Sequence, residues 1–267
     1  MLIRLIFLLF ALGLPPLLKA EEIRLHVPII EEHTSQHHFF HELLKESLIA
    51  AGHTPVLITQ TLPQLRANKL METGDISIMW LLESETRNKQ FVPVEVGLTK
   101  GLIGQRVMLI RKEEQARFND IRTLEQLQKK NFHTALGKKW FDIDIWQKNQ
   151  LPYASVDGNW RTMFKLLKKG RVDYLSRSVI EVTQENKEHP ELTIEKNLML
   201  IYNRDYRFYL SHTGKHSGKQ YKALLENALR RAKSSSLLDR LIHKYWKDDF
   251  EQLGYEHRRH IYLQTPK

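Results

Sequence analysis

Strands and helices alternate through the first eighty residues, and this alternation constrains the fold more than any other feature of the sequence. Residues 23–27 alternate apolar and polar side chains like a half-buried strand, and residues 39–51 carry apolar side chains at helical spacing. Residues 55–59 and 76–80 read as strands, and residues 62–71 between them read as a short helix. A β-α-β-α-β order requires parallel pairing with right-handed crossovers, so the chain is predicted to be an α/β protein.

A second α/β unit follows a β-rich stretch over residues 92–110, which glycines interrupt. Such a stretch can leave one sheet and enter another. Strands are expected at residues 132–136, 153–156 and 172–175, each followed by a helical pattern, and strand-like segments return at residues 198–210. The second unit is therefore predicted to be inserted in the first.

This order predicts two lobes joined by two β crossovers. Lobe 1 is expected to contain residues 21–102 together with residues 199–267. Lobe 2 is expected to contain the inserted residues 103–198.

The first twenty residues have the pattern of a cleavable signal peptide. Arg4 supplies a positive charge, residues 5–14 form an apolar run, and Ala20 is a small residue at a plausible cleavage point. An uncleaved membrane anchor is the alternative, although ten apolar residues are few for a membrane span. We expect cleavage near Ala20 and a periplasmic mature protein.

The composition excludes several kinds of site. The chain has no cysteine, which excludes a disulfide scaffold, a thiolate zinc site, a cysteine nucleophile and a lipoprotein-type anchor. Its net charge of +10 is typical of some nucleic-acid-binding proteins, but the chain lacks a glycine-flanked aromatic RNA motif and carries an export signal. We therefore expect no nucleic-acid partner. An anionic ligand or an anionic membrane surface explains the positive surplus better.

Four segments carry a resemblance to a known family: residues 100–107, 136–142, 170–179 and 260–263. Their order and spacing resemble those of periplasmic solute-binding protein family 3, the polar amino-acid binders with the type II periplasmic binding fold. The resemblance implies two lobes, each a mostly parallel sheet flanked by helices, that close on a small-molecule ligand. It also implies a monomer that delivers its ligand to an ABC transporter permease in the inner membrane.

The resemblance also implies ligand-binding residues in lobe 1. In amino-acid binders of this fold an arginine after the third strand holds the ligand carboxylate, and Arg87 is the nearest match. The planar guanidinium suits this role because it pairs with a carboxylate through two hydrogen bonds. Trp80, at the end of the third strand, is expected to form an aromatic wall, or alternatively to be a core residue.

In lobe 2 the chain departs from the amino-acid-binding pattern. Ser178, preceded by Arg177, stands where a carboxylate would hold the ligand ammonium, and Lys138 stands where a small hydroxylated residue is frequent. With Trp140 as a second wall, these residues predict a carboxylate-bearing or anionic ligand. The alternatives are that Ser178 only caps the next helix, and that Arg177 and Lys138 are ordinary surface charges.

Catalytic and metal-binding motifs are scarce. The sequence contains no Gly-x-Ser-x-Gly elbow, Walker loop or His-Glu-x-x-His motif, so we expect no enzyme and no cofactor. His37 and His41 lie one helical turn apart near His33, but no fourth ligand is evident, and a solvated helix face is the preferred interpretation. Two alternatives stay open beside the transport protein: an extracytoplasmic sensor that feeds a signalling partner, and an enzyme on the same scaffold.

Overall fold

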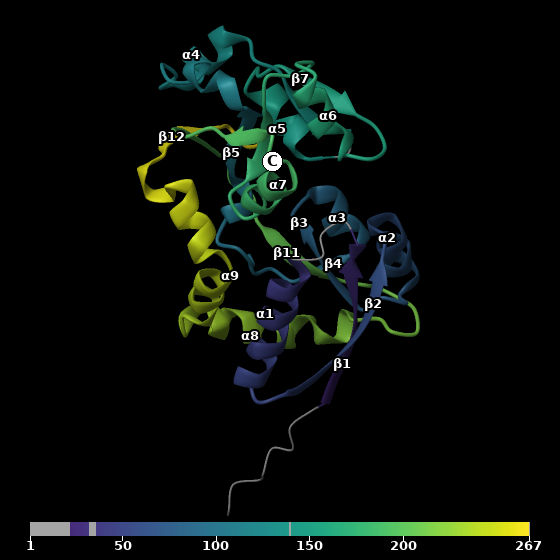
Figure 1. Ribbon diagram of the computed structural model, residues 1–267. Coiled ribbons are helices and arrows are strands. Elements are labelled where there is room, and N and C mark those ends of the chain that lie inside the picture. Colours follow the sequence, from purple (N-terminus) through teal and green to yellow (C-terminus); the bar gives the residue numbers. More distant parts are fainter. Residues whose placement is uncertain (1–21, 32–35, 139, 267) are drawn as a thin grey trace, which may run out of the picture.

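The computed structural model describes residues 22–31, 36–138 and 140–266. The predicted signal peptide, with its cleavage point at Ala20, lies outside these residues. Figure 1 shows two lobes, one above the other, connected on one side by extended segments and by a long helix.

Lobe 1 is the lower body in Figure 1. Its strands β1 and β2 pair in parallel, as predicted, and β11 lies antiparallel between β3 and β4. The backbone N–H of Ser77 donates to the carbonyl of His26, which places β3 beside β1. The elements of lobe 1 are β1 (Glu22–Ile30), α1 (Gln36–Ala50), β2 (Thr54–Leu62), α2 (Gln64–Thr73), β3 (Ile78–Leu82), α3 (Glu85–Gln90), β4 (Val92–Pro93), β11 (Tyr206–Leu210), α8 (Lys222–Ser234) and α9 (Leu237–Leu253).

Lobe 2 is built around a sheet in the order β12-β10-β5-β8, with β9 also paired to β5 and with a parallel β6–β7 pair beside it. A bridge between Thr134 and Tyr174 connects the β6–β7 pair to the segment before β8. The elements of lobe 2 are β5 (Gln105–Arg111), α4 (Leu124–Lys130), β6 (Thr134–Gly137), α5 (Asp142–Lys148), β7 (Tyr153–Val156), α6 (Thr162–Lys168), β8 (Leu175–Ser178), α7 (Val182–Glu188), β9 (Leu192–Ile194), β10 (Leu198–Ile201) and β12 (Arg259–Tyr262).

The C-terminal tail differs from the prediction. We expected residues 199–267 to lie wholly in lobe 1, but β12 pairs in parallel with β10 in the sheet of lobe 2. Helix α9 ends at Gly254, whose φ of 58° is left-handed, and the chain then enters lobe 2. The chain therefore passes between the lobes three times, and the expectation of only two crossovers is wrong.

Asp205 joins the two predicted crossovers to each other. Its carboxylate accepts hydrogen bonds from the backbone N–H groups of Thr99 (2.9 Å) and Gly101 (3.1 Å). A Cβ atom at Gly97 would lie 2.4 Å from a carboxylate oxygen of Asp205, so this close approach requires glycine. Burial raises the pKa of Asp205, and the hydrogen bonds from Thr99 and Gly101 oppose that shift.

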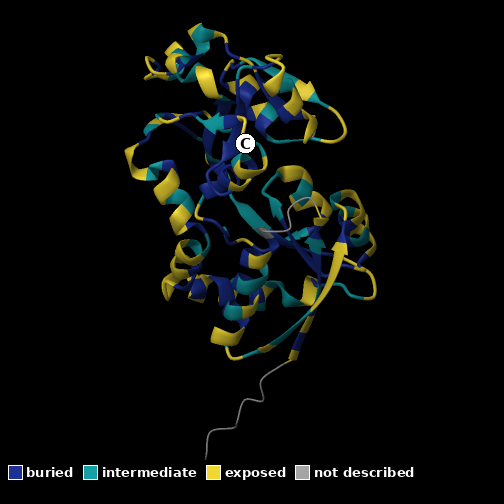
Figure 2. Cartoon of the chain, viewed as in Figure 1, coloured by how far each residue is buried: buried dark blue, intermediate teal, exposed yellow. Residues whose placement is uncertain are grey.

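Buried residues fill the inside of both lobes in Figure 2. Ile23, Leu25 and Val27 of β1 are buried whereas Arg24 is exposed, which confirms the alternation predicted for this strand. In the described part of the chain, no helix has the length and apolar character needed to span a membrane.

Candidate ligand-binding cleft

A cavity of about 860 Å³ lies between the two lobes. Lobe 1 contributes Trp80, Arg87 and Tyr206, and lobe 2 faces them with residues from the ends of β6 and β8 and from the loop after β7. Its volume is in the range typical of small-molecule sites. The position between two lobes, rather than within one, means that movement of the lobes would change its shape.

Arg87 enters this cavity from the first turn of α3. The helix begins there because the hydroxyl of Ser84 accepts a hydrogen bond from the backbone N–H of Arg87 at 3.3 Å. The guanidinium donates to the carbonyl of Leu82, and burial lowers the pKa of Arg87. Nearby Glu83 pairs with Arg207 instead, at 2.9 Å. Among the described residues no carboxylate lies within ion-pair distance of Arg87.

Arg177 lies at the end of β8, where it is buried and fully paired. Its Nε donates to Glu185 at 2.7 Å, and its Nη2 lies 3.2 Å from a carboxylate oxygen of Glu181. The guanidinium also lies 5.2 Å from the ring centre of Trp140 and 5.0 Å from that of Trp160, which are cation–π distances. Burial alone would lower the pKa of Arg177, but the carboxylates of Glu185 and Glu181 outweigh it and raise the pKa.

A second buried ion pair adjoins the first. Arg106 of β5 lies 3.1 Å from Asp142 at the start of α5, and the hydroxyl of Tyr202 donates to the same carboxylate at 3.0 Å. Arg106 also lies 3.8 Å from Glu181. This buried network therefore contains two arginines, Arg106 and Arg177, and three carboxylates, from Asp142, Glu181 and Glu185. By count the network has one more carboxylate than arginine, and burial raises the pKa of Glu185 although Arg177 opposes that shift.

Lys138 lines the mouth of the cavity, where it is exposed. Its ammonium lies 2.8 Å from a carboxylate oxygen of Asp157 in the loop after β7. The hydrogen bond with Asp157 raises the pKa of Lys138. Lys138 is thus already neutralised, as is Arg177.

The charge around the whole cavity is nearly balanced, in contrast to the positive surplus that the sequence predicted. Five basic side chains face four acidic ones, and Glu185 lies behind Arg177. The charged lining residues are Arg87, Arg106, Lys138, Arg161 and Arg177, against Glu72, Asp142, Asp157 and Glu181.

Two tryptophans form walls on opposite lobes. Trp80 is 8% exposed and stacks on Phe40 at 4.8 Å with an interplanar angle of 14°, so it belongs to the core of lobe 1 and lines the cavity at the same time. Trp140 is half-buried in lobe 2, 6.1 Å from Trp160. Trp80 is thus a core residue, as one interpretation of the sequence had it, and its contact with a ligand stays a prediction.

Ser178 is the predicted site residue that the structure does not bring into the lining of the cavity. It is fully buried, and its hydroxyl donates to the carbonyl of Leu102 at 3.0 Å. Ser178 is paired with Arg106 in the β5–β8 ladder, so it is the last strand residue, and α7 begins only at Val182. The carboxylate of Glu181, three residues later, lines the cavity in its place.

The histidines at the start of α1 do not form a metal centre within the described part of the chain. No group of three His, Asp or Glu side chains there is arranged to hold a metal ion, and His33 lies outside it. His41 instead makes a 3.1 Å hydrogen bond to the carbonyl of Pro28, and its ring lies edge-on to Trp80 at 5.6 Å.

Comparison with known proteins identifies the fold. No sequence-family model and no curated protein matches the chain. The probable extracellular-binding protein of an amino-acid ABC transporter from Bacillus subtilis is similar in structure, with a TM-score of 0.61 at 17% identity over 86% of this chain and 100% of that one.

Two further solved structures are also similar. An ancestral arginine-binding protein bound to glutamine has a TM-score of 0.57 at 14% identity, over 85% of this chain and 99% of that one. An amino-acid ABC transporter substrate-binding protein from Streptococcus pneumoniae, bound to L-arginine, has a TM-score of 0.56 at 14% identity, over 85% and 95%. The chain therefore has the two-lobed type II periplasmic binding fold, the fold of the substrate-binding proteins of amino-acid ABC transporters.

Proposed function

We propose that the protein is a periplasmic solute-binding protein that closes its two lobes around a small ligand carrying a carboxylate. The observation that supports this proposal best is the Arg87 guanidinium, which lines the cavity without a carboxylate partner among the described residues. It is a half-buried guanidinium at the inter-lobe cavity, and in the part of the chain that the structure describes its side chain donates to one group, the backbone carbonyl of Leu82. A buried charge is costly unless it is paired, so a ligand carboxylate would supply what the described residues do not.

The opposite wall of the cavity favours a positive group on the same ligand. The buried network around Arg106 and Arg177 contains one more carboxylate than arginines. Of these carboxylates, Glu181 lies near both arginines and also lines the cavity. The sequence predicts a carboxylate-bearing or anionic ligand. Because Lys138 and Arg177 already have acidic partners, a ligand with only negative groups fits less well. A zwitterion, with a carboxylate at Arg87 and an ammonium or other cationic group near Glu181, satisfies both walls.

The proposed role in uptake rests on the fold and on the export signal. A binding protein of this kind shifts from an open to a closed population when its ligand binds the closed state more tightly. The loaded form would then dock on an inner-membrane permease. A sensor protein would close on its ligand in the same way. The membrane partner that is isolated with the ligand-loaded protein distinguishes the two roles, because it is a permease in uptake and a signalling protein in sensing.

The test is a ligand screen on residues 21–267, the predicted mature chain. Thermal unfolding is measured with amino acids, dicarboxylates and sugars, since a ligand that binds only the native state raises the midpoint by mass action. We expect zwitterionic amino acids to raise it and dicarboxylates to leave it unchanged. Calorimetric titration then measures affinity, and NMR of the recovered ligand checks that it is chemically unchanged. A dicarboxylate or sugar as the preferred ligand, or turnover of the ligand, contradicts the proposal.

A further inference from the structure

One face of lobe 1 carries positive charge that the fold leaves without acidic partners. Between His212 and Lys247 the sequence has nine Lys and Arg residues but two acidic ones, Glu226 and Asp239. Eight of the nine basic residues are exposed. Lys244 lies 2.7 Å from Glu42 and Lys247 lies 3.6 Å from Glu251. The other six are here called the basic face: Lys215, Lys219, Arg230, Arg231, Lys233 and Arg240.

The two acidic residues of this stretch are already engaged. Glu226 lies 3.2 Å from Arg230 and 3.6 Å from the half-buried Lys222, and Asp239 lies 2.6 Å from Lys100. Within the described residues, every member of the basic face except Arg230 lacks a carboxylate at ion-pair distance. The face therefore keeps most of its charge.

The basic residues of lobe 2 provide a contrast. Arg117 lies 2.7 Å from Asp173, Lys130 lies 2.9 Å from Asp120, and Arg161 lies 3.2 Å from Glu188. Many charges on that lobe are thus neutralised locally, although the lobe is also rich in lysine and arginine. The surplus on α8 is not simply a consequence of a basic composition.

The face is broad and poor in apolar anchors. Helix α8 has 13 residues, so the charges along it and its preceding loop extend over at least about 20 Å. The large apolar side chains that are exposed in the described chain are Ile49, Ile58, Leu65 and Tyr262, and none of them lies between His212 and Lys247. A protein–protein interface usually has aromatic or apolar anchors at its centre, whereas a charged lipid surface needs none.

The start of the fold lies beside this face. His26 of β1 stacks on His216 at 3.7 Å, and Lys215 is close enough to lower the pKa of His26, after burial and the charge of His216. Glu22, where β1 begins, is four residues before His26. The apolar run of residues 5–14 ends eight residues before Glu22, a length that spans at most about 29 Å.

We propose that the basic face binds the anionic phospholipid headgroups of the membrane from which the protein is exported. Binding is electrostatic, with the ammonium and guanidinium groups of the face opposite lipid phosphates. The face lies on α8, the loop before it and the first turn of α9, whereas the ligand cavity lies between the lobes, so membrane binding and ligand binding are independent. Weak attachment of this kind would keep the protein near a membrane transporter.

The experiment measures co-sedimentation of residues 21–267, which contain every described element, with phospholipid vesicles. One set of vesicles is phosphatidylcholine alone, and the other contains added phosphatidylglycerol. We expect binding only to the second set, and loss of that binding at high salt because screening shortens the range of surface charges. Each basic residue near an anionic surface contributes roughly a fivefold change in affinity. Arg231→Glu/Lys233→Glu should therefore weaken binding by at least about 25-fold.

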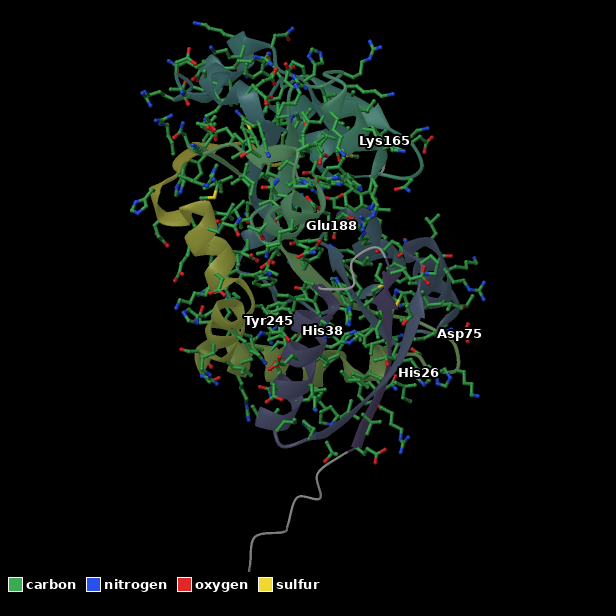
Figure 3. All side chains as sticks on the ribbon, in the orientation of Figure 1. His26, His38, Asp75, Lys165, Glu188 and Tyr245 are labelled. Atoms are coloured by element: carbon green, nitrogen blue, oxygen red, sulfur yellow. The ribbon has the colours of Figure 1, made fainter. Side chains whose placement is uncertain are left out.

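A matched control separates this face from total charge. Lys165→Glu/Lys169→Glu makes the same change in net charge on exposed residues of lobe 2, and Figure 3 shows Lys165 on the upper lobe. This control should bind vesicles nearly as the unchanged protein does. Three outcomes would overturn the proposal. The first is an equal loss of vesicle binding in both variants, and the second is equal binding to vesicles with and without phosphatidylglycerol. The third is no binding to phosphatidylglycerol vesicles, which would favour an acidic protein partner. Arg87→Ala should leave vesicle binding unchanged, so failure of this proposal is distinguishable from failure of the ligand proposal.

Discussion

Arg177 and Glu185 form a two-point ion pair at the back of the cleft, with Nε–Oε2 and Nη2–Oε1 distances of 2.7 and 2.5 Å. Both side chains are buried, with 4% and 11% of their surfaces exposed. The pair places a guanidinium at the cavity wall, between Trp140 and Trp160, without leaving its charge free. Arg177 therefore belongs to the rigid wall of the site, and a ligand carboxylate would have to compete with Glu185 for it.

Removing Arg177 should destabilise the protein strongly. Arg177→Ala leaves Glu185 and Glu181 buried with one arginine fewer, and breaking a buried pair from one side typically costs about 3–5 kcal/mol. Urea unfolding at neutral pH measures the loss in the free energy of unfolding. Arg161→Ala is the control, because its pair with Glu188 is solvent-exposed and exposed pairs contribute roughly 0–1 kcal/mol. Similar free energies of unfolding for the two variants would contradict this account.

Removing Arg87 should affect the ligand more than the fold. Arg87→Ala deletes a guanidinium that has no acidic partner in the described structure, so the stability of the ligand-free protein should change little. Affinity for the ligand identified by the screen should fall by roughly tenfold to a hundredfold, the equivalent of one charge-assisted hydrogen bond. Arg87→Lys keeps the charge but not the planar fork and should lie between the two. Calorimetric titration of the three proteins checks this order, and equal affinities would exclude Arg87 from the site.

The parallel β1–β2 unit was predictable because its signal is local. Ile23, Leu25 and Val27 alternate with polar residues, and the helix that follows has apolar residues at a spacing of three and four. Such patterns depend on neighbouring residues only. The structure confirms both elements, with boundaries shifted by a few residues.

The third passage between the lobes was not predictable in the same way. Strand β12 has four residues, of which Ile261 is the buried one, and its partner β10 is some sixty residues earlier in the sequence. No local pattern specifies so distant a partner.

The acidic side of the cleft was missed for a related reason. Ser178 and Glu181 have the spacing of a capping box, so Ser178 was expected to cap the next helix or to contact the ligand. The ladder with β5 keeps Ser178 in the strand, and the helix starts later. Half of the capping box is still formed, because the backbone N–H of Ser178 donates to the carboxylate of Glu181 at 3.4 Å. Strand pairing nevertheless delays the start of the helix, and Glu181 lines the cavity.

The tail should contribute to stability through Arg258. Its buried guanidinium donates to the carbonyls of Leu253, Glu195 and Leu198, at 2.9, 2.6 and 3.0 Å, and so connects the end of α9 to lobe 2. Arg258→Ala leaves these carbonyls buried without that donor, at a cost of about 1–3 kcal/mol for each group left unsatisfied. We expect a loss of at least about 2 kcal/mol in the free energy of unfolding, measured with urea. Exposed His260→Ala in β12 is the control and should cost less than about 0.5 kcal/mol.

His41 should make the stability depend on pH in the mildly acidic range. Burial, with the charges of His37 and His38, lowers the pKa of His41 to about 4, against the opposing hydrogen bond to Pro28. The unfolded chain takes up a proton near the ordinary pKa of 6.5, whereas the folded protein does so only near 4. Between these values the unfolded state binds more protons, so the contribution of His41 is complete above pH 6.5 and is lost as the pH falls.

The size of this effect follows from the shift in pKa. Each unit corresponds to about 1.4 kcal/mol, so the loss between pH 6.5 and 4 is up to roughly 3 kcal/mol. In His41→Gln, a side chain that does not titrate keeps an N–H donor for the carbonyl of Pro28. The variant should therefore lose less stability than the unchanged protein when the pH is lowered from 7 to 5. Thermal unfolding of both proteins at the two pH values measures the difference, and exposed His243→Gln, which should behave like the unchanged protein, is the control. An identical pH response in His41→Gln and the unchanged protein would show that His41 titrates in the folded state as it does in the unfolded chain.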